Sequence, residues 1–148
     1  MATIYFGSDH AGLSHKKILM AHCEGQGHKV IDLGAFAVEP PTDYPEIAHE
    51  VAEKVRENEG DVKGILVCGT GIGMCMAANK HDGIRGANCE SEETVRMSRL
   101  HNDANVLCIG GRVLSEELAK KMVDIFLNTM FDGGDRHVRR VEKIEKTK

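Results

Sequence analysis

A cysteine stands where an apolar run breaks into a glycine-rich turn. In ILVCGTGIGMCMAANK, residues 65–80, Cys68 is followed by Gly69, Gly71 and Gly73 and then by a helix-forming stretch. Glycines let the backbone turn tightly and aim several N–H groups inward, and the following helix adds the positive end of its dipole. We expect a thiol in this position to be available as a thiolate near neutral pH, so Cys68 is a candidate nucleophile or base.

The same turn has other interpretations. A glycine-rich connection with a buried cysteine, packed as a small hydrophobe, is the simplest alternative. The dinucleotide pattern G-x-G-x-x-G is absent because Met74 and Cys75 follow Gly73, and the Gly-Lys-Ser/Thr of a Walker loop is absent as well. Glu90 stands where the ribose-binding acid of a dinucleotide site would stand, which alone is a weak match. We expect the remaining thiols to pack in the core: Cys23, Cys75, Cys89 and Cys108.

Two further segments carry residues suited to acid–base chemistry. Asp9 and His10 follow the first apolar run, where the pair could orient an imidazole or bind a hydroxyl; a local turn or cap is the alternative. The segment SRLHNDAN, residues 98–105, places His101 and Asn102 shortly before another apolar run. The end of a helix with an asparagine cap would also explain it, but His101 is a candidate acid.

Arginines concentrate near the end of the chain. Arg136 and Arg140 are four residues apart and therefore share one helical face, and with His137 and Arg139 they form the densest cationic cluster of an acidic sequence. Arginine matches the oxygens of a phosphate with paired hydrogen bonds, so this cluster, together with Arg112, could clamp a phosphate. A solvated tail is the alternative.

Composition excludes several classes of protein. The chain has 148 residues and a formal net charge of −4, which argues against general attraction to nucleic acid or to anionic membranes. No His or Cys pair shows C-x-x-C or H-x-x-x-H spacing, so no metal is expected. The N-terminus lacks the pattern of a signal peptide, and no apolar run approaches the roughly 18 residues that span a bilayer. We expect a cytoplasmic protein with reduced thiols.

The elements that position these residues alternate between strands and helices. Short apolar or β-branched runs predict five strands, at residues 3–6, 29–33, 62–67, 83–88 and 105–109. A helix is expected from Pro45, two more after the caps Ser91 and Ser115, and a last one in the basic tail, residues 136–148. This alternation predicts a single domain, residues 1–148, with a three-layer α/β/α sandwich around a parallel sheet.

In an open parallel sheet, ligands bind beyond the carboxyl ends of the strands. Polar residues and glycines follow the first, third and fifth predicted strands. We therefore expect one shared rim made of Ser8, Asp9, His10, Cys68, Gly69, Thr70, Gly110, Gly111 and Arg112.

Five segments, taken together and in this order, closely resemble ribose-5-phosphate isomerase B. They are GSDHAG (7–12), TDYP (42–45), CGTGIG with AANK (68–80), SRLHNDANVL (98–107) and GGDRHVRRVE (133–142). The resemblance spans nearly the whole chain. It implies an aldose-ketose isomerase without metal or cofactor, which interconverts ribose 5-phosphate and ribulose 5-phosphate in the pentose phosphate pathway. It also implies a homodimer, or a tetramer built from dimers, with active sites shared between subunits.

The resemblance also implies roles for individual residues. Cys68 matches the base, and His101 the acid that opens the furanose ring; isomerisation also needs a donor for the enediolate oxygen, for which the loop amides and Thr70 are candidates. Substrate binding is expected at Asp9, His10, Gly69, Gly71, Ile72, Gly73, Asn102, Arg112, Arg136 and Arg140. The C-terminal helix would carry the last two into the partner subunit.

Two departures from the family pattern affect these roles. An extra residue lies between the glycine pair and Arg136, so the arginines are assigned from RHVRRV and not from their distance to Gly134. Met74 stands where part of the family has a glutamate base. The cysteine version of the chemistry is therefore expected.

Other functions fit the same scaffold. A galactose-6-phosphate or allose-6-phosphate isomerase would use the same base and clamp in a roomier pocket. A non-catalytic nucleotide or flavin module is a candidate from another class, because α/β sandwiches host many functions. A receiver-like signalling domain is disfavoured, since Cys68 occupies the place of the phosphoacceptor aspartate and no lysine follows the fifth predicted strand.

Overall fold

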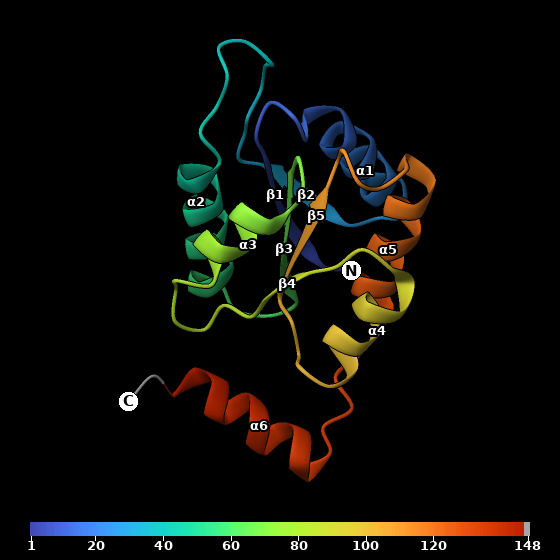
Figure 1. Cartoon of the computed structure of the whole chain (residues 1–148). Coiled ribbons are helices and arrows are strands. Elements are labelled where there is room, and N and C mark those ends of the chain that lie inside the picture. Colours follow the sequence, from blue (N-terminus) through green and yellow to red (C-terminus); the bar gives the residue numbers. More distant parts are fainter. Residues whose placement is uncertain (147–148) are drawn as a thin grey trace.

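A five-stranded parallel sheet forms the centre of the molecule (Figure 1). The structure, a computed structural model, describes residues 1–146. The strands are β1 (Thr3–Ser8), β2 (Lys29–Asp32), β3 (Val62–Cys68), β4 (Gly86–Asn88) and β5 (Val106–Gly110). Their order across the sheet is β2-β1-β3-β5-β4, and every neighbouring pair is parallel. The predicted α/β fold with five strands is confirmed.

Helices cover both faces of this sheet, as expected for a parallel sheet whose strands are apolar on both sides. The helices are α1 (Leu13–Gly25), α2 (Tyr44–Glu57), α3 (Ile72–Ala78), α4 (Glu92–Leu100), α5 (Glu116–Asn128) and α6 (Asp135–Glu145). Figure 1 shows α2 and α3 on one face and α1, α4 and α5 on the other. Two aliphatic cores result, with Ile65 and Val67 of β3 in the core under α1 and α5 and Leu66 and Cys68 in the core under α2 and α3.

Local sequence signals predicted the starts of α2, α4 and α5 to within one residue. The buried stripe of α2 includes Ala48, Val51, Ala52 and Val55, as predicted. The Ser91 and Ser115 side chains cap α4 and α5 by accepting the N–H groups three residues on, at 3.2 and 3.1 Å. The fourth strand is shorter than predicted, because Gly83 adopts a left-handed φ of 81° and the chain turns before Gly86.

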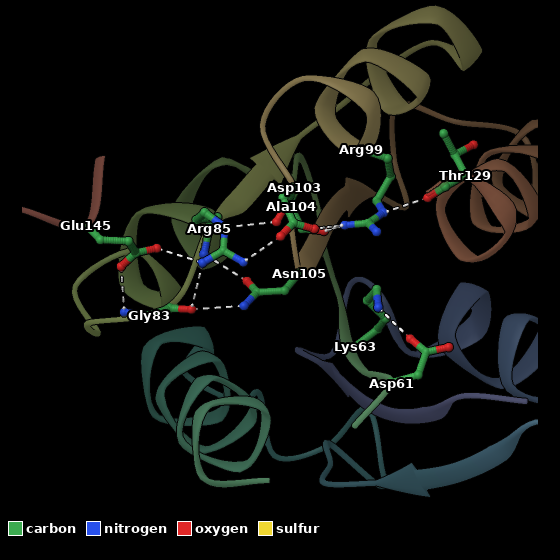
Figure 2. A network of polar contacts seen from close by, with 10 residues as sticks. All are labelled: Asp61, Lys63, Gly83, Arg85, Arg99, Asp103, Ala104, Asn105, Thr129 and Glu145. Carbon is green, nitrogen blue, oxygen red and sulfur yellow. Dashed lines mark hydrogen bonds and ion pairs between the residues drawn. The ribbon is translucent and has the colours of Figure 1, made fainter. Parts of the chain in front are cut away.

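The C-terminal helix α6 lies apart from the two helical layers (Figure 1). The last two residues of the predicted tail helix lie outside the described residues. Near its start, His137 is buried against the rest of the chain, with 7% exposure. Near its end, Glu145 pairs with Arg85 at 2.6 Å and accepts the N–H of Gly83 at 3.0 Å (Figure 2). None of the helices within residues 1–146 is both long and apolar enough to cross a membrane.

Candidate active site

The carboxyl ends of β1, β3 and β5 form one edge, as predicted. Cys68 is the register partner of Gly110, and Ser8 that of Val67. Backbone hydrogen bonds join the connections beyond the strands: Gly111 N donates to Cys68 O at 2.8 Å, and Arg112 N to Gly69 O at 3.1 Å. The Arg112 side chain covers Gly69, where an added Cβ would lie 3.3 Å from Nη1. Arg112 therefore lies at the same edge of the sheet as Cys68, where the strands have their carboxyl ends.

The glycine turn encloses the Cys68 thiol. Cys68 is 5% exposed, and the Gly71 N–H donates to its Sγ at 3.1 Å. Gly71 has a φ of 85°, and an added Cβ there would lie 2.5 Å from Asn88 Nδ2 and 2.8 Å from the Ile109 carbonyl carbon. Only glycine fits this position. The turn therefore supplies a backbone hydrogen-bond donor to the sulfur of Cys68.

Two side chains that the sequence did not indicate support this turn. Asn88 Nδ2 donates to Cys108 O at 3.1 Å and to Thr70 O at 3.3 Å, which fastens the turn to the end of β5. The ring of Tyr44, the first residue of α2, fills the space that a side chain at position 73 would need. Tyr44 lies within the TDYP segment, so that motif was the available signal for it.

Asp9 and His10 start the connection after β1. Asp9 Oδ1 accepts the Gly12 N–H at 3.0 Å, which is the local turn considered as an alternative. Asp9 is 7% exposed, whereas His10 is half-buried. Thr42 N donates to His10 Nδ1 at 3.3 Å, so the neutral ring carries its proton on Nε2. This nitrogen can donate to a bound hydroxyl.

A buried lysine holds the loop next to this connection. Lys16 is 0% exposed, and its Nζ donates to Asp32 Oδ1 at 2.6 Å and to Ala35 O at 2.5 Å. The loop pairs in turn with Ser8, whose N donates to Gly34 O at 2.7 Å. Burial lowers the pKa of Lys16, and the hydrogen bond and charge of Asp32 oppose that shift. No sequence motif pointed to Lys16.

The other predicted residues gather at the opposite edge of the sheet. His101 and Asn102 lie in the connection before β5, at its amino end, and Arg136 and Arg140 lie on α6. Since β5 has five residues, a rise of about 13 Å separates its two ends. Within a single chain, Cys68 is therefore far from the other predicted site residues, which are His101, Asn102, Arg136 and Arg140.

Within this second group, two imidazoles stack. The ring centroids of His101 and His137 are 4.3 Å apart, and their planes differ by 8°. Asp132 lies beside them, and one ligand atom from each of the three residues lies within 4.8 Å of the others, a spacing at which a metal ion could be considered. However, Arg136 Nε donates to His137 Nε2 at 3.2 Å. A cation there would have to displace the guanidinium and open the stack, so the arrangement does not favour a metal.

The sequence is similar to those of known proteins along nearly its whole length. The family described as Ribose/Galactose Isomerase matches residues 4–144. The chain belongs to this family. It is 47% identical to ribose-5-phosphate isomerase B of Escherichia coli over 144 residues, which cover 97% of this chain and 95% of that protein. It is 35% identical to a D-erythrulose-4-phosphate isomerase of Pectobacterium atrosepticum over 144 residues, 97% of this chain and 93% of that one.

A solved structure of another isomerase of the family contains a sugar phosphate. It is ribose-5-phosphate isomerase B from Mycoplasma genitalium with bound ribulose-5-phosphate. The TM-score is 0.93 and the identity 45%, covering 97% of this chain and 93% of that chain. The fold of this chain is therefore that of the isomerase family.

The structure also places Met74 and the four cysteines other than Cys68. Met74 is 0% exposed and packs in the core under α2 and α3, so its side chain does not reach solvent. Cys23, Cys89 and Cys108 are buried as predicted. Cys75 packs against the core under α2 and α3 as predicted, but it is only half-buried, and its Sγ accepts from Asn79 Nδ2 at 3.5 Å. Burial raises the pKa of Cys23 to about 12, which makes that thiol inert.

Two hollows accompany these groups. A cavity of about 400 Å³ lies between α3, the start of β4 and α6, and it is lined among others by Asn79, Arg85, Asn102 and Glu145. It contains neither Cys68 nor His101. A shallower hollow of about 480 Å³ lies along residues 33–42, which include the Thr42 that contacts His10.

Proposed function

We propose that this chain is an aldose-ketose isomerase that interconverts ribose 5-phosphate and ribulose 5-phosphate. The observation that carries the proposal is the Cys68 thiol, held beneath a glycine turn whose Gly71 N–H points at its sulfur. Support comes from relatives that bear this activity in their names and from the ribulose-5-phosphate complex of the Mycoplasma genitalium protein.

In the proposed mechanism, Cys68 is the base of the isomerisation. As a thiolate it removes the C2 proton of the open-chain aldose, which gives an enediolate, and returns the proton to C1. A proton also passes from the C2 hydroxyl to the C1 oxygen, so that C1 becomes the alcohol and C2 the carbonyl. The amides of the Gly69–Gly73 turn and the Thr70 hydroxyl stabilise the enediolate oxygen. Donors of this type contribute about 3 to 4 kcal/mol in other enzymes. Asp9 and His10 hold hydroxyls of the sugar.

The remaining roles belong to the opposite edge, so we propose that the site is shared between two copies of the chain. His101 of one subunit would protonate the ring oxygen as the furanose opens over Cys68 of the other. Asn102, Arg136 and Arg140 of the same subunit would bind the substrate and its phosphate. In a two-fold dimer each copy presents the same pair of edges, so two complete sites form.

Two further features support association. Ile72 and Met76 of α3 are exposed apolar side chains close to the glycine turn, at 47% and 66% exposure. The helix α6 lies outside the two helical layers of its own chain (Figure 1). A helix in this position can reach a second subunit, and its arginines are exposed and available to a phosphate.

A coupled assay with ribose 5-phosphate tests the proposal. Turnover of ribose 5-phosphate is expected both with and without a chelator. Allose 6-phosphate and galactose 6-phosphate should be poorer substrates. The assay also includes D-erythrulose 4-phosphate, a four-carbon sugar phosphate, because the Pectobacterium relative is named for it. A preference for six-carbon or four-carbon sugar phosphates would move the assignment to another branch of the family, and no turnover of any sugar phosphate would overturn it.

A further inference from the structure

The imidazole of His101 is oriented by another ring. His101 follows the last residue of α4, and its backbone N–H donates to Met97 O at 2.9 Å. Its ring nitrogens have no hydrogen-bond partner among residues 1–146, whereas its face lies flat on His137, with 4.3 Å between centroids and 8° between planes. The stack is therefore the contact that sets the direction of this ring within the chain.

His137 is itself held firmly. It lies in the first turns of α6, and at 7% exposure it is the buried residue of that helix. Its Nε2 accepts from Arg136 Nε at 3.2 Å, and Asp132 Oδ2 lies 3.6 Å from the same nitrogen. His137 Nε2 therefore lies between the Arg136 guanidinium and the Asp132 carboxylate, and the tautomer that accepts from Arg136 has its ring proton on Nδ1.

Backbone contacts bring the start of α6 to the end of α4. Asp132 N donates to Leu100 O at 3.1 Å, directly before His101. Arg99 Nε donates to Thr129 O at 3.0 Å, and Arg99 Nη1 binds Asp103 at 2.9 Å, so the guanidinium joins three segments (Figure 2). These bonds fix the two rings at stacking distance before any substrate is present.

We propose that His137 is a positioning residue that aims His101 at the ring oxygen of the sugar and links it to the phosphate-binding Arg136. The inference rests on the proposed function. His137 does not touch substrate in this scheme: its face sets the orientation of the His101 ring, and its Nε2 sets that of the Arg136 guanidinium. His137 thereby fixes the His101 imidazole and the Arg136 guanidinium relative to each other, and these two groups bind opposite ends of the sugar phosphate.

Two reactions separate this role from a general effect on the fold. Turnover of ribose 5-phosphate requires ring opening, which His101 assists. Ribulose 5-phosphate has no free hydroxyl that could close a furanose ring, so Cys68 can exchange its C1 proton for solvent deuterium without help from His101. A residue that acts only through His101 should affect the first reaction far more than the second.

The test compares His137→Ala, His137→Phe and the exposed control Arg139→Ala in the intact protein. We expect His137→Ala to lower kcat for ribose 5-phosphate about 10- to 100-fold, as misplacement of a catalytic group does, with C1 deuterium exchange within about threefold of wild type. His137→Phe keeps a stacking ring but no acceptor for Arg136, so it should recover most of kcat and show a raised KM. Arg139→Ala should behave as wild type.

Each other outcome has a definite meaning. Wild-type turnover in His137→Ala, equal loss of turnover and exchange, or a His137→Phe variant no better than His137→Ala would overturn the positioning role. If His137→Ala does not fold, His137→Gln replaces it, because it offers an acceptor without a ring. A wild-type protein that neither turns over ribose 5-phosphate nor exchanges ribulose 5-phosphate would instead refute the proposed function.

Discussion

Cys68 is buried, yet it lies at the end of a strand and beneath backbone donors. A buried thiol packed only against apolar groups would be inert, as Cys23 is with its pKa of about 12. What differs at Cys68 is the Gly71 N–H, 3.1 Å from the sulfur. In the proposed mechanism, this backbone donor distinguishes Cys68 from the core cysteine Cys23.

Replacement of Cys68 tests its role as base. Cys68→Ala should lower kcat for ribose 5-phosphate by at least the factor of about 100 to 10,000 that general bases contribute, with KM near that of wild type. The variant loses the hydrogen bond from the Gly71 N–H, but the Asn88 hydrogen bonds that join the turn to the end of β5 do not involve the sulfur. Steady-state kinetics on a purified variant measure this. Cys75→Ser is the matched control, and substantial turnover by Cys68→Ala would exclude the cysteine as base.

The arginines of α6 are tested by their effect on binding. Arg140→Ala should raise KM for ribose 5-phosphate about 10- to 100-fold while changing kcat little, because a charge-assisted hydrogen bond contributes about 1.5 to 3 kcal/mol. Arg139 is equally exposed and one position away along the helix, so Arg139→Ala controls for loss of charge. An unchanged KM would remove Arg140 from the phosphate clamp.

At the scale of elements, the loop after β2 is set by a lysine of α1. Lys16 Nζ reaches Asp32 and the carbonyl of Ala35, and residues 34 and 35 pair with Ser8 at the end of β1. The loop therefore closes over the start of the Asp9–His10 connection. Burying an ammonium group lowers the free energy of unfolding. The hydrogen bonds of Lys16 to Asp32 and Ala35 offset part of this cost and fix the loop beside the site.

The burial of the Lys16 ammonium predicts that the stability of the protein depends on pH. The pKa of Lys16 is lower in the folded chain than in the unfolded chain, so the unfolded chain binds the proton more strongly. The free energy of unfolding of wild type should therefore rise, relative to Lys16→Met, as pH increases toward the usual lysine pKa of about 10.4. Urea unfolding at pH 8 and pH 10 measures this. The exposed Lys17→Met should show no such trend, and a trend of the opposite sign for Lys16→Met would contradict the burial argument.

At the scale of the whole molecule, the two halves of the proposed site lie at opposite edges of one sheet. Cys68, Thr70, Arg112 and His10 belong to the carboxyl edge, whereas His101 and the α6 arginines belong to the amino edge and its surroundings. A single copy would then be inactive, and activity would depend on assembly.

Mixing two inactive variants tests this arrangement. Cys68→Ala and His101→Asn should each be nearly inactive, but a mixed dimer contains one site with both native groups. After random exchange of subunits, activity should return to about one quarter of wild type, since half of the dimers are mixed and each has one native site. A mixture of Cys68→Ala with Cys68→Ser should recover nothing. If mass spectrometry shows mixed dimers and activity does not return, the site lies within one chain.

The sequence by itself determined the family, the order of strands and helices along the chain, and much of the local structure. The helix caps Ser91 and Ser115, the stripe of α2 and the rim of Asp9, Cys68 and Arg112 were all predicted correctly. Caps and stripes depend on residues within one or two turns, and parallel strands place their carboxyl ends on one edge whatever their order. Because these signals lie within short stretches of the chain, they can be recognised from the sequence alone.

The tertiary structure alone decided which residues meet across the fold. Lys16 looks like any helical lysine until Asp32 and Ala35 are brought over it, and Tyr44 meets Gly73 only because α2 and α3 pack side by side. The pairing of His101 with His137 likewise depends on how α6 leaves the end of α5. Such contacts join residues far apart in the chain, and their geometry follows from the packing of whole elements rather than from any local pattern.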